Sequence, residues 1–127
     1  MKKFISLVAV ACAMGLSGQV LAHGAKPKHG GVVASAGDLA FELVSKDGKA
    51  TIYVDDHGRA LATREAKGTL TVLHGTKKTE TTLQPGDDNT LTSTANVDLA
   101  PGAKAVASIT LAGKPPISVR FSLKKLK

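Results

Sequence analysis

Two histidines near the start of the chain are the residues whose types and spacing point most directly to chemistry. His23 and His29 stand on either side of Gly24-Ala25-Lys26-Pro27-Lys28. Imidazole binds Cu, Zn and Ni, and short histidine-bearing tracts are typical of metal sites. Because Pro27 and the flanking glycines oppose regular structure, the segment can bring both imidazoles to one ion. The sequence therefore predicts a metal site at His23 and His29, with an exposed polar leader as the alternative that stays open.

The chemistry of His23 depends on a predicted cleavage. Lys2 and Lys3 precede a short apolar run, and Val20-Leu21-Ala22 suits signal peptidase. We therefore expect residues 1–22 to be a signal peptide, the protein to be periplasmic, and no membrane span to remain after processing. His23 would then begin the mature chain, where its α-amino group (pKa about 7.7–8.0) and its imidazole (about 6.5) both deprotonate near neutral pH.

Sulfur ligands are confined to the predicted leader. Cys12 is the only cysteine, and Met1 and Met14 are the only methionines. A lipid anchor on Cys12 is disfavoured because Ala9-Val10-Ala11 lacks the usual upstream leucine. Soft Cu(I) prefers cysteine or methionine, whereas imidazole and oxygen suit Cu(II), Zn(II) and Ni(II). The mature chain is therefore predicted to bind Cu(II) or Zn(II), and no motif indicates an organic cofactor.

The other two histidines have competing interpretations. His57 lies in Asp55-Asp56-His57-Gly58, which combines carboxylates and imidazole as an oxygen and nitrogen site would. The same residues form a good turn, and the two readings are compatible. Adjacent side chains of an extended strand point to opposite faces, so at most two of them would share an ion. His74 follows Leu70 and Val72 on one strand face, which favours a partly buried histidine over a ligand.

Several classes of function lack their usual signals. The sequence contains no Gly-x-Ser-x-Gly elbow, phosphate-binding glycine loop or HExxH helix, so we predict that the protein is not an enzyme. Its formal net charge is +7, which by itself suits nucleic-acid binding. However, Phe41, Tyr53 and Phe121 are the only aromatic residues after the leader, and none is interleaved with a basic cluster. We therefore expect no nucleic-acid partner.

The rest of the chain has the pattern of short strands. From residue 32 onward, apolar and polar residues alternate between turn signals without a helical period. Asp47-Gly48 separates two alternating runs, as in a two-residue hairpin. Strand spacing near 8–12 residues is typical of a β-sandwich. We predict an all-β, immunoglobulin-like antiparallel sandwich of about seven strands over residues 32–127, after a flexible His/Gly/Lys arm at residues 23–31.

Segments along most of the mature chain resemble one group of proteins. Its most specific parts are Lys28-His29-Gly30-Gly31 and Asp56-His57-Gly58, and the others are residues 41–44, 46–48, 52–55, 70–73 and 102–106. They are similar to small exported proteins of Gram-negative bacteria and to accessory domains of periplasmic adaptor subunits in heavy-metal efflux systems. The resemblance implies a periplasmic β-domain that handles copper, zinc or related metals, with His29 and His57 as candidate ligands. The chain lacks the helical hairpin and lipoyl-like segments of an adaptor, so an efflux component is at most a partner.

Two functional hypotheses follow, beside a disfavoured third, a metal-dependent enzyme, which would require a preformed site of three ligands. The first is a periplasmic metal-binding accessory protein that buffers or delivers Cu(II) or Zn(II) through His23 and His29, joined by His57 where the arm docks near that turn. A component of a heavy-metal efflux system is a candidate partner, and whether the protein binds one stays open. The second is a non-catalytic protein-interaction or structural β-domain whose histidines are incidental. Loss of stoichiometric binding on substitution of His23 or His29 distinguishes the two.

Overall fold

The structure is a computed structural model that describes residues 26–123. The predicted signal peptide, His23 and the last four residues lie outside the described residues. Nine strands make up the described fold: β1 Val32–Ala36, β2 Leu39–Lys46, β3 Lys49–Asp56, β4 Arg59–Ala60, β5 Lys67–His74, β6 Lys77–Pro85, β7 Thr90–Ser93, β8 Lys104–Thr110 and β9 Ile117–Ser122. The all-β prediction is confirmed for this part of the chain. Residues 26–123 include no helix of the length and apolar character needed to cross a membrane.

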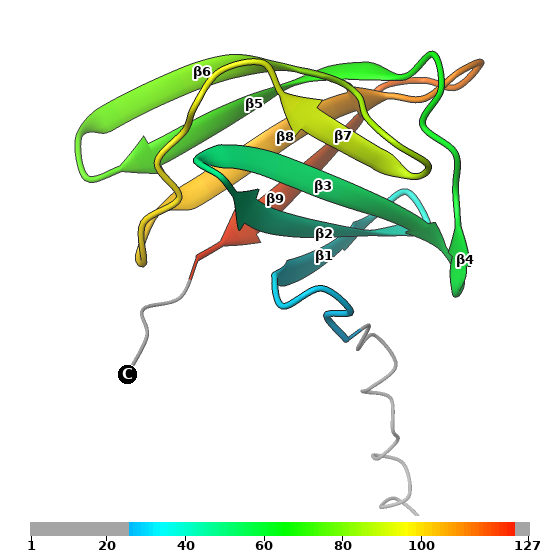
Figure 1. Ribbon diagram of the computed structural model, residues 1–127, viewed down its shortest axis with the longest axis horizontal. Helices are drawn as coiled ribbons and strands as arrows, with labels where there is room; N and C mark the ends of the chain where they lie inside the picture. The colour runs from blue at the N-terminus through cyan, green and yellow to red at the C-terminus, as the bar shows by residue number, and fades with distance from the viewer. Residues whose placement is uncertain (1–25, 124–127) are drawn as a thin grey trace, which may run out of the picture.

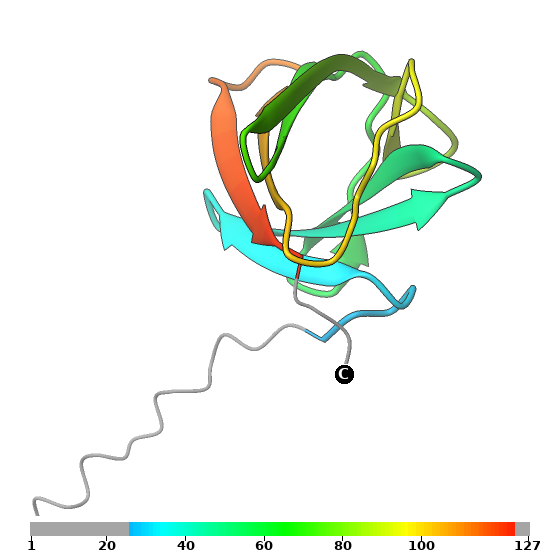
Figure 2. The same ribbon diagram turned by 90° about the vertical axis from the view of Figure 1, so that its left-hand side faces the viewer.

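All of the strands belong to one antiparallel sheet. Its order is β1-β2-β3-β7-β6-β5-β8-β9, and the two-residue strand β4 pairs with β3. The first and last strands of this path, β1 and β9, lie next to each other. The sheet therefore curls round until it nearly closes into a barrel, as the view along its interior in Figure 2 shows.

This arrangement differs from the predicted immunoglobulin-like sandwich. The prediction placed about seven strands in two stacked sheets, whereas the described chain forms one sheet, a continuous path of eight strands with β4 beside β3, as the ribbon in Figure 1 lets the reader follow. Both architectures bury every second residue of each strand. The sequence alternation therefore cannot distinguish a sheet that packs on another sheet from one that curls onto itself.

One hydrophobic core fills the interior of the curled sheet. Phe41 and Phe121 are among its largest buried side chains, and β8 contributes the small buried residues Ala105 and Ala107. The predicted alternation in the first hairpin is confirmed, because Leu39, Phe41, Leu43, Ala50, Ile52 and Val54 are all buried. The alternate residues of these strands consequently face outward.

The turn of the first hairpin also follows the prediction. Lys46 pairs with Lys49 across Asp47 and Gly48, whose φ angles are 55° and 82°. Two positive φ angles are the requirement of a type I′ turn, and Asp-Gly meets it at low strain. This register brings one outward-facing residue from each of four neighbouring strands into a row, namely Val33, Glu42, Tyr53 and Thr90.

Candidate functional site

A buried carboxylate lies in this outer row. Glu42 points away from the hydrophobic core, yet only 6% of it is exposed, because the chain that leads into β1 covers it. We call this chain, residues 26–31, the entry segment. Lys28 N–H donates to Glu42 Oε1 at 2.9 Å, and the N–H groups of His29 and Gly31 both donate to Oε2 at 2.8 Å. Three main-chain donors thus converge on one side chain.

Two opposing effects set the charge state of Glu42. Burial raises the pKa of its carboxyl group, whereas the main-chain donors of Lys28, Gly31 and His29, together with the nearby charge of His29, lower it. The net result is a pKa below the ordinary value of 4.5. Hydrogen bonds to the charged form outweigh the cost of burying it. Glu42 is therefore an anion near neutral pH.

The close approach of the entry segment to β2 requires a glycine. A Cβ atom at Gly31 would lie 2.3 Å from the Leu43 carbonyl oxygen and 2.7 Å from a Val44 methyl group. A main-chain oxygen at that distance cannot move aside without displacing β2. The Gly30-Gly31 pair, which the sequence analysis assigned only to flexibility, therefore includes a residue that allows the segment to dock.

The entry segment places His29 on an aromatic partner. The rings of His29 and Tyr53 are stacked, with centroids 3.6 Å apart and planes inclined by 9°. Tyr53 is the cross-strand neighbour of Glu42 in the β2–β3 register. The main chain and the side chain of His29 are thus held by two adjacent residues of the same row. His29 as a whole remains exposed to solvent.

Lys28 extends the contact towards the turn between β3 and β4. Its Nζ lies 3.4 Å from Asp55 Oδ1, and the other oxygen of Asp55 accepts the Gly58 N–H at 2.7 Å. The Lys28 side chain is 61% exposed, so this ion pair contributes little to stability. The contact joins the entry segment to Asp55, near the end of β3.

These elements enclose a groove of about 510 Å³. Asn89 closes one side, where its Nδ2 donates to the Val54 carbonyl at 2.8 Å. We call this the entry groove. Its lining combines lysines, carboxylates and an imidazole with apolar side chains: Lys26, Lys28, His29, Val33, Ala40, Phe41, Glu42, Tyr53, Asp55, Gly58, Ala60 and Asn89.

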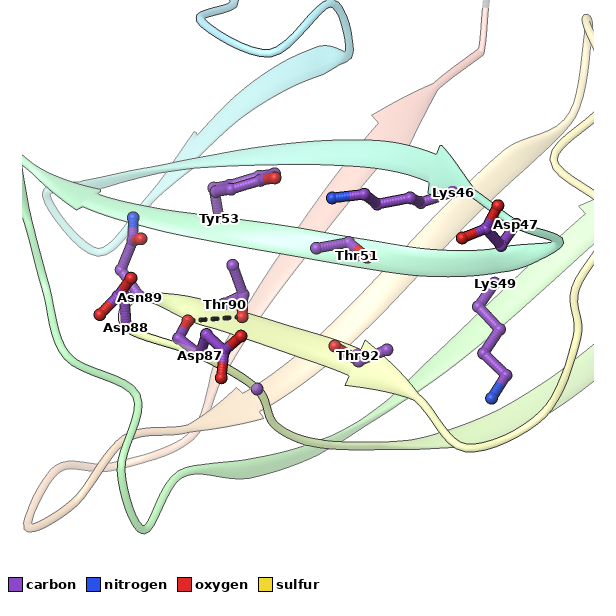
Figure 3. Close-up of a pocket in the computed structure, with 11 residues that line it drawn as sticks. Lys46, Asp47, Lys49, Thr51, Tyr53, Asp87, Asp88, Asn89, Thr90 and Thr92 are labelled. Carbon is purple, nitrogen blue, oxygen red and sulfur yellow. Dashed lines mark hydrogen bonds between the residues drawn. The ribbon is translucent and has the colours of Figure 1, made fainter.

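A second groove, of about 620 Å³, lies beside it on the same outer face and shares Tyr53 and Asn89 with it. Figure 3 shows hydroxyl groups from β3 and β7 along its floor, and Thr90 Oγ1 donating to the Asp87 carbonyl at 2.7 Å. Its charged residues have both signs: Lys46, Lys49, Asp47, Asp87 and Asp88. Because neither sign dominates, this groove does not indicate one class of ligand.

The four histidines considered as site residues lie in different parts of the chain and do not form one cluster among the described residues. His29 lines the entry groove, and His23 lies outside the described residues. His57 occupies the β3–β4 turn with a φ of 53°, and its Nδ1 is 2.7 Å from Asp56 Oδ1. His74, predicted to be partly buried, is exposed at the end of β5. Within residues 26–123, no three histidine, aspartate or glutamate side chains come together as a metal site.

The turn interpretation of residues 55–58 is confirmed. Asp56 pairs with Arg59 across His57 and Gly58, and Asp55 accepts the Gly58 N–H. The two carboxylates have different partners, since Asp55 contacts Lys28 whereas Asp56 contacts His57. They do not converge on a common point with the imidazole.

Sequence reasoning missed Glu42 and Tyr53. Both stand at alternate positions of the two runs on either side of Asp47-Gly48, a place where glutamate and tyrosine are ordinary. The available signal was the pair Gly30-Gly31 next to His29, because adjacent glycines can mark a close approach of two chain segments. Comparison with protein-family models, curated proteins and solved structures finds no match to this chain.

Proposed function

We propose that this protein is an exported, non-catalytic metal-binding accessory protein that takes up Cu(II) or Zn(II) at the entry groove. The observation that carries the proposal is the placement of His29, whose main chain binds Glu42 and whose ring stacks on Tyr53. The imidazole is held in one position while the residue remains exposed. A held, accessible imidazole loses less conformational freedom on binding an ion than one on a free arm.

His29 alone is not a complete site, and His23 is the residue that would complete it. Six residues of extended chain span at most about 20–22 Å, so the length of the chain between His23 and His29 permits both residues to reach one ion. If the predicted cleavage after Ala22 occurs, His23 contributes an imidazole and an α-amino nitrogen. Together with His29 these make three nitrogen ligands, a set that Cu(II) and Zn(II) accept.

The proposed role is buffering or delivery of the ion. His29 is exposed, so an ion bound there would be accessible to another protein, which suits transfer. A component of a heavy-metal efflux system is the partner class we propose, and the periplasm is the proposed location. His57 is a secondary candidate, because its turn borders the entry groove through Asp55 and Gly58.

The single tyrosine of the chain makes the test specific. The sequence contains one tyrosine, Tyr53, and no tryptophan, so fluorescence reports on the residue against which His29 stacks. Paramagnetic Cu(II) bound at His29 is expected to quench this emission, whereas Zn(II), which is d¹⁰, should compete with Cu(II) without quenching. The titration uses processed protein whose first residue is shown to be His23 by intact mass.

Matched variants locate the ion. His29→Gln should abolish the quench at equimolar Cu(II), and His74→Gln, which alters an exposed histidine at the end of β5, should leave it unchanged. Calorimetry should show one ion bound with at least micromolar affinity and protons released. A wild-type titration without heat or quench overturns the metal hypothesis and favours the interaction-domain alternative.

A further inference from the structure

The strand topology gathers the excess positive charge of the described chain at one end of the barrel. Because neighbouring strands run antiparallel, the β2–β3 turn, the β5–β6 turn and the loop from β7 to β8 all lie at this end, and Figure 2 looks onto it. We call it the lysine end. Its charged residues are five lysines and two aspartates, namely Lys46, Lys49, Lys77, Lys78, Lys104, Asp47 and Asp98.

The opposite end of the barrel has no such excess. There, six basic residues, two of them in the entry segment, are balanced by six acidic ones: Asp38, Asp55, Asp56, Glu65, Asp87 and Asp88. Within residues 26–123, both ion pairs with carboxylates also lie at that opposite end, around the β3–β4 turn. The lysines of the lysine end therefore keep their charge free of such contacts in the described structure, and an anionic surface attracts this end of the molecule first.

An exposed leucine stands among these lysines. Leu73 of β5 is 42% exposed, the large hydrophobic side chain that the described fold leaves most open to solvent. In the sheet register it lies between Lys78 of β6 and Lys104 of β8, with adjacent strands about 4.8 Å apart. A leucine alone on a surface is ordinary. A leucine with an exposed lysine on each side combines the apolar and cationic groups of an interfacial membrane contact.

We propose that the lysine end binds the surface of an anionic phospholipid bilayer and that Leu73 enters the lipid there. Lysines close to such a bilayer are held by its negative surface potential, and their long stems let the charges stay at the headgroups while the leucine reaches the acyl boundary. Leu73, Lys78 and Lys104 line neither groove and face outward from a curled sheet. This convex row fits a broad, deformable surface better than a small anion.

Vesicle flotation tests the electrostatic part of the proposal. Protein that begins at His23 should bind vesicles of equal parts phosphatidylglycerol and phosphatidylcholine, should not bind pure phosphatidylcholine, and should be released by salt. The double variant Lys78→Gln/Lys104→Gln should bind about 30-fold more weakly. Lys67→Gln/Lys114→Gln is the matched control, because it removes the same charge at the opposite end and should have much less effect. Residues 124–127 are identical in all variants, so the differences report on the described face.

A tryptophan probe tests the insertion of Leu73. The sequence contains no tryptophan, so the emission of Leu73→Trp reports on that position. It should shift to shorter wavelength with the anionic vesicles, whereas Ala112→Trp, at an exposed position between β8 and β9, should show no shift. Leu73→Ser should weaken vesicle binding about fivefold. Circular dichroism checks that the barrel is intact, since position 73 faces away from the core.

The outcomes decide between lipid and other anions. If wild type does not bind the anionic vesicles, or if the two double variants lose affinity equally, the proposal is overturned. If heparin binds the lysine end while Leu73→Ser keeps full vesicle affinity and the emission of Leu73→Trp does not shift, the surface is a general polyanion site and the lipid proposal is wrong. Cu(II) binding should be the same in Lys78→Gln/Lys104→Gln as in wild type, so the metal hypothesis and this proposal stand or fall separately.

Discussion

Two regions of the outer surface contain the same residue types, a histidine beside carboxylates, and use them differently. At the entry segment, the Glu42 carboxylate is 6% exposed and accepts three main-chain N–H groups. At the β3–β4 turn, the Asp56 carboxylate contacts the adjacent His57, and their side chains are 48% and 77% exposed. The first carboxylate binds the main chain of residues 28–31, whereas the second contacts its sequence neighbour.

The burial and hydrogen bonding of a carboxylate, more than its proximity to a histidine, therefore determine how firmly it holds the neighbouring chain. Water competes for the exposed pair at the turn and screens it, so its contribution to stability is small. Around Glu42, water is largely excluded, and each hydrogen bond to the charged group contributes more. Both regions were candidate metal sites by composition, but His57 contacts its sequence neighbour Asp56, whereas His29 stacks on Tyr53 of another strand.

Glycine substitution should produce the largest contrast between the two regions. Gly31→Ala forces a Cβ atom against the Leu43 carbonyl, so we expect it to lower the free energy of unfolding by about 1–3 kcal/mol and to change the Tyr53 emission. Gly58→Ala has open space around its Cβ but a φ of 91°, so it should cost about 1 kcal/mol and leave Tyr53 unchanged. Denaturant titration followed by fluorescence measures both effects. Identical Tyr53 emission in the two variants would show that Gly31 does not control the docking of the entry segment on Tyr53.

Acid should weaken the entry segment through Glu42. The pKa of this group is lower in the folded protein than its ordinary value of 4.5, so the folded state binds its proton less readily than the unfolded state. The resulting stabilisation is complete above pH 4.5 and is lost as the pH falls through the folded pKa. We therefore expect the stability advantage of wild type over Glu42→Gln to shrink on acidification below pH 4.5, in denaturant titrations at several pH values. An advantage that stays constant with pH would show that the charge of Glu42 is unimportant.

The smallest effect is expected at the turn. Asp56→Asn and His57→Gln each remove one partner of an exposed pair, so each should change the free energy of unfolding by no more than about 0.5 kcal/mol. Neither should alter Tyr53 emission. A loss comparable to that of Gly31→Ala would mean that the turn is as organised as the entry segment, and the distinction between the regions would fail.

Local structure in this protein was largely predictable. Alternation identified the buried residues of β2 and β3, and Asp47-Gly48 identified their turn, because period-two burial and positive φ angles depend on neighbouring residues alone. Asp55-Asp56-His57-Gly58 was likewise recognisable as a turn. The closure of the sheet was not predictable, since strands of a sandwich and of a barrel show the same alternation.

In the candidate site, too, the sequence predicted local features but not contacts between distant segments. His29 was singled out from its residue type and its spacing from His23, and both properties can be read from the chain. Its partners Glu42 and Tyr53 could not be chosen from many outward-facing strand residues.

The sequence by itself determined an all-β chain, its first hairpin and the chemical types able to bind a metal, because these follow from residue identity and local spacing. Only the tertiary structure decided which outward carboxylate is buried and which histidine is held. The entry segment lies more than ten residues from Glu42 along the chain, and the β2–β3 register then places Tyr53 beside both. Contacts between distant segments depend on how the sheet pairs and curls, and no local pattern encodes that.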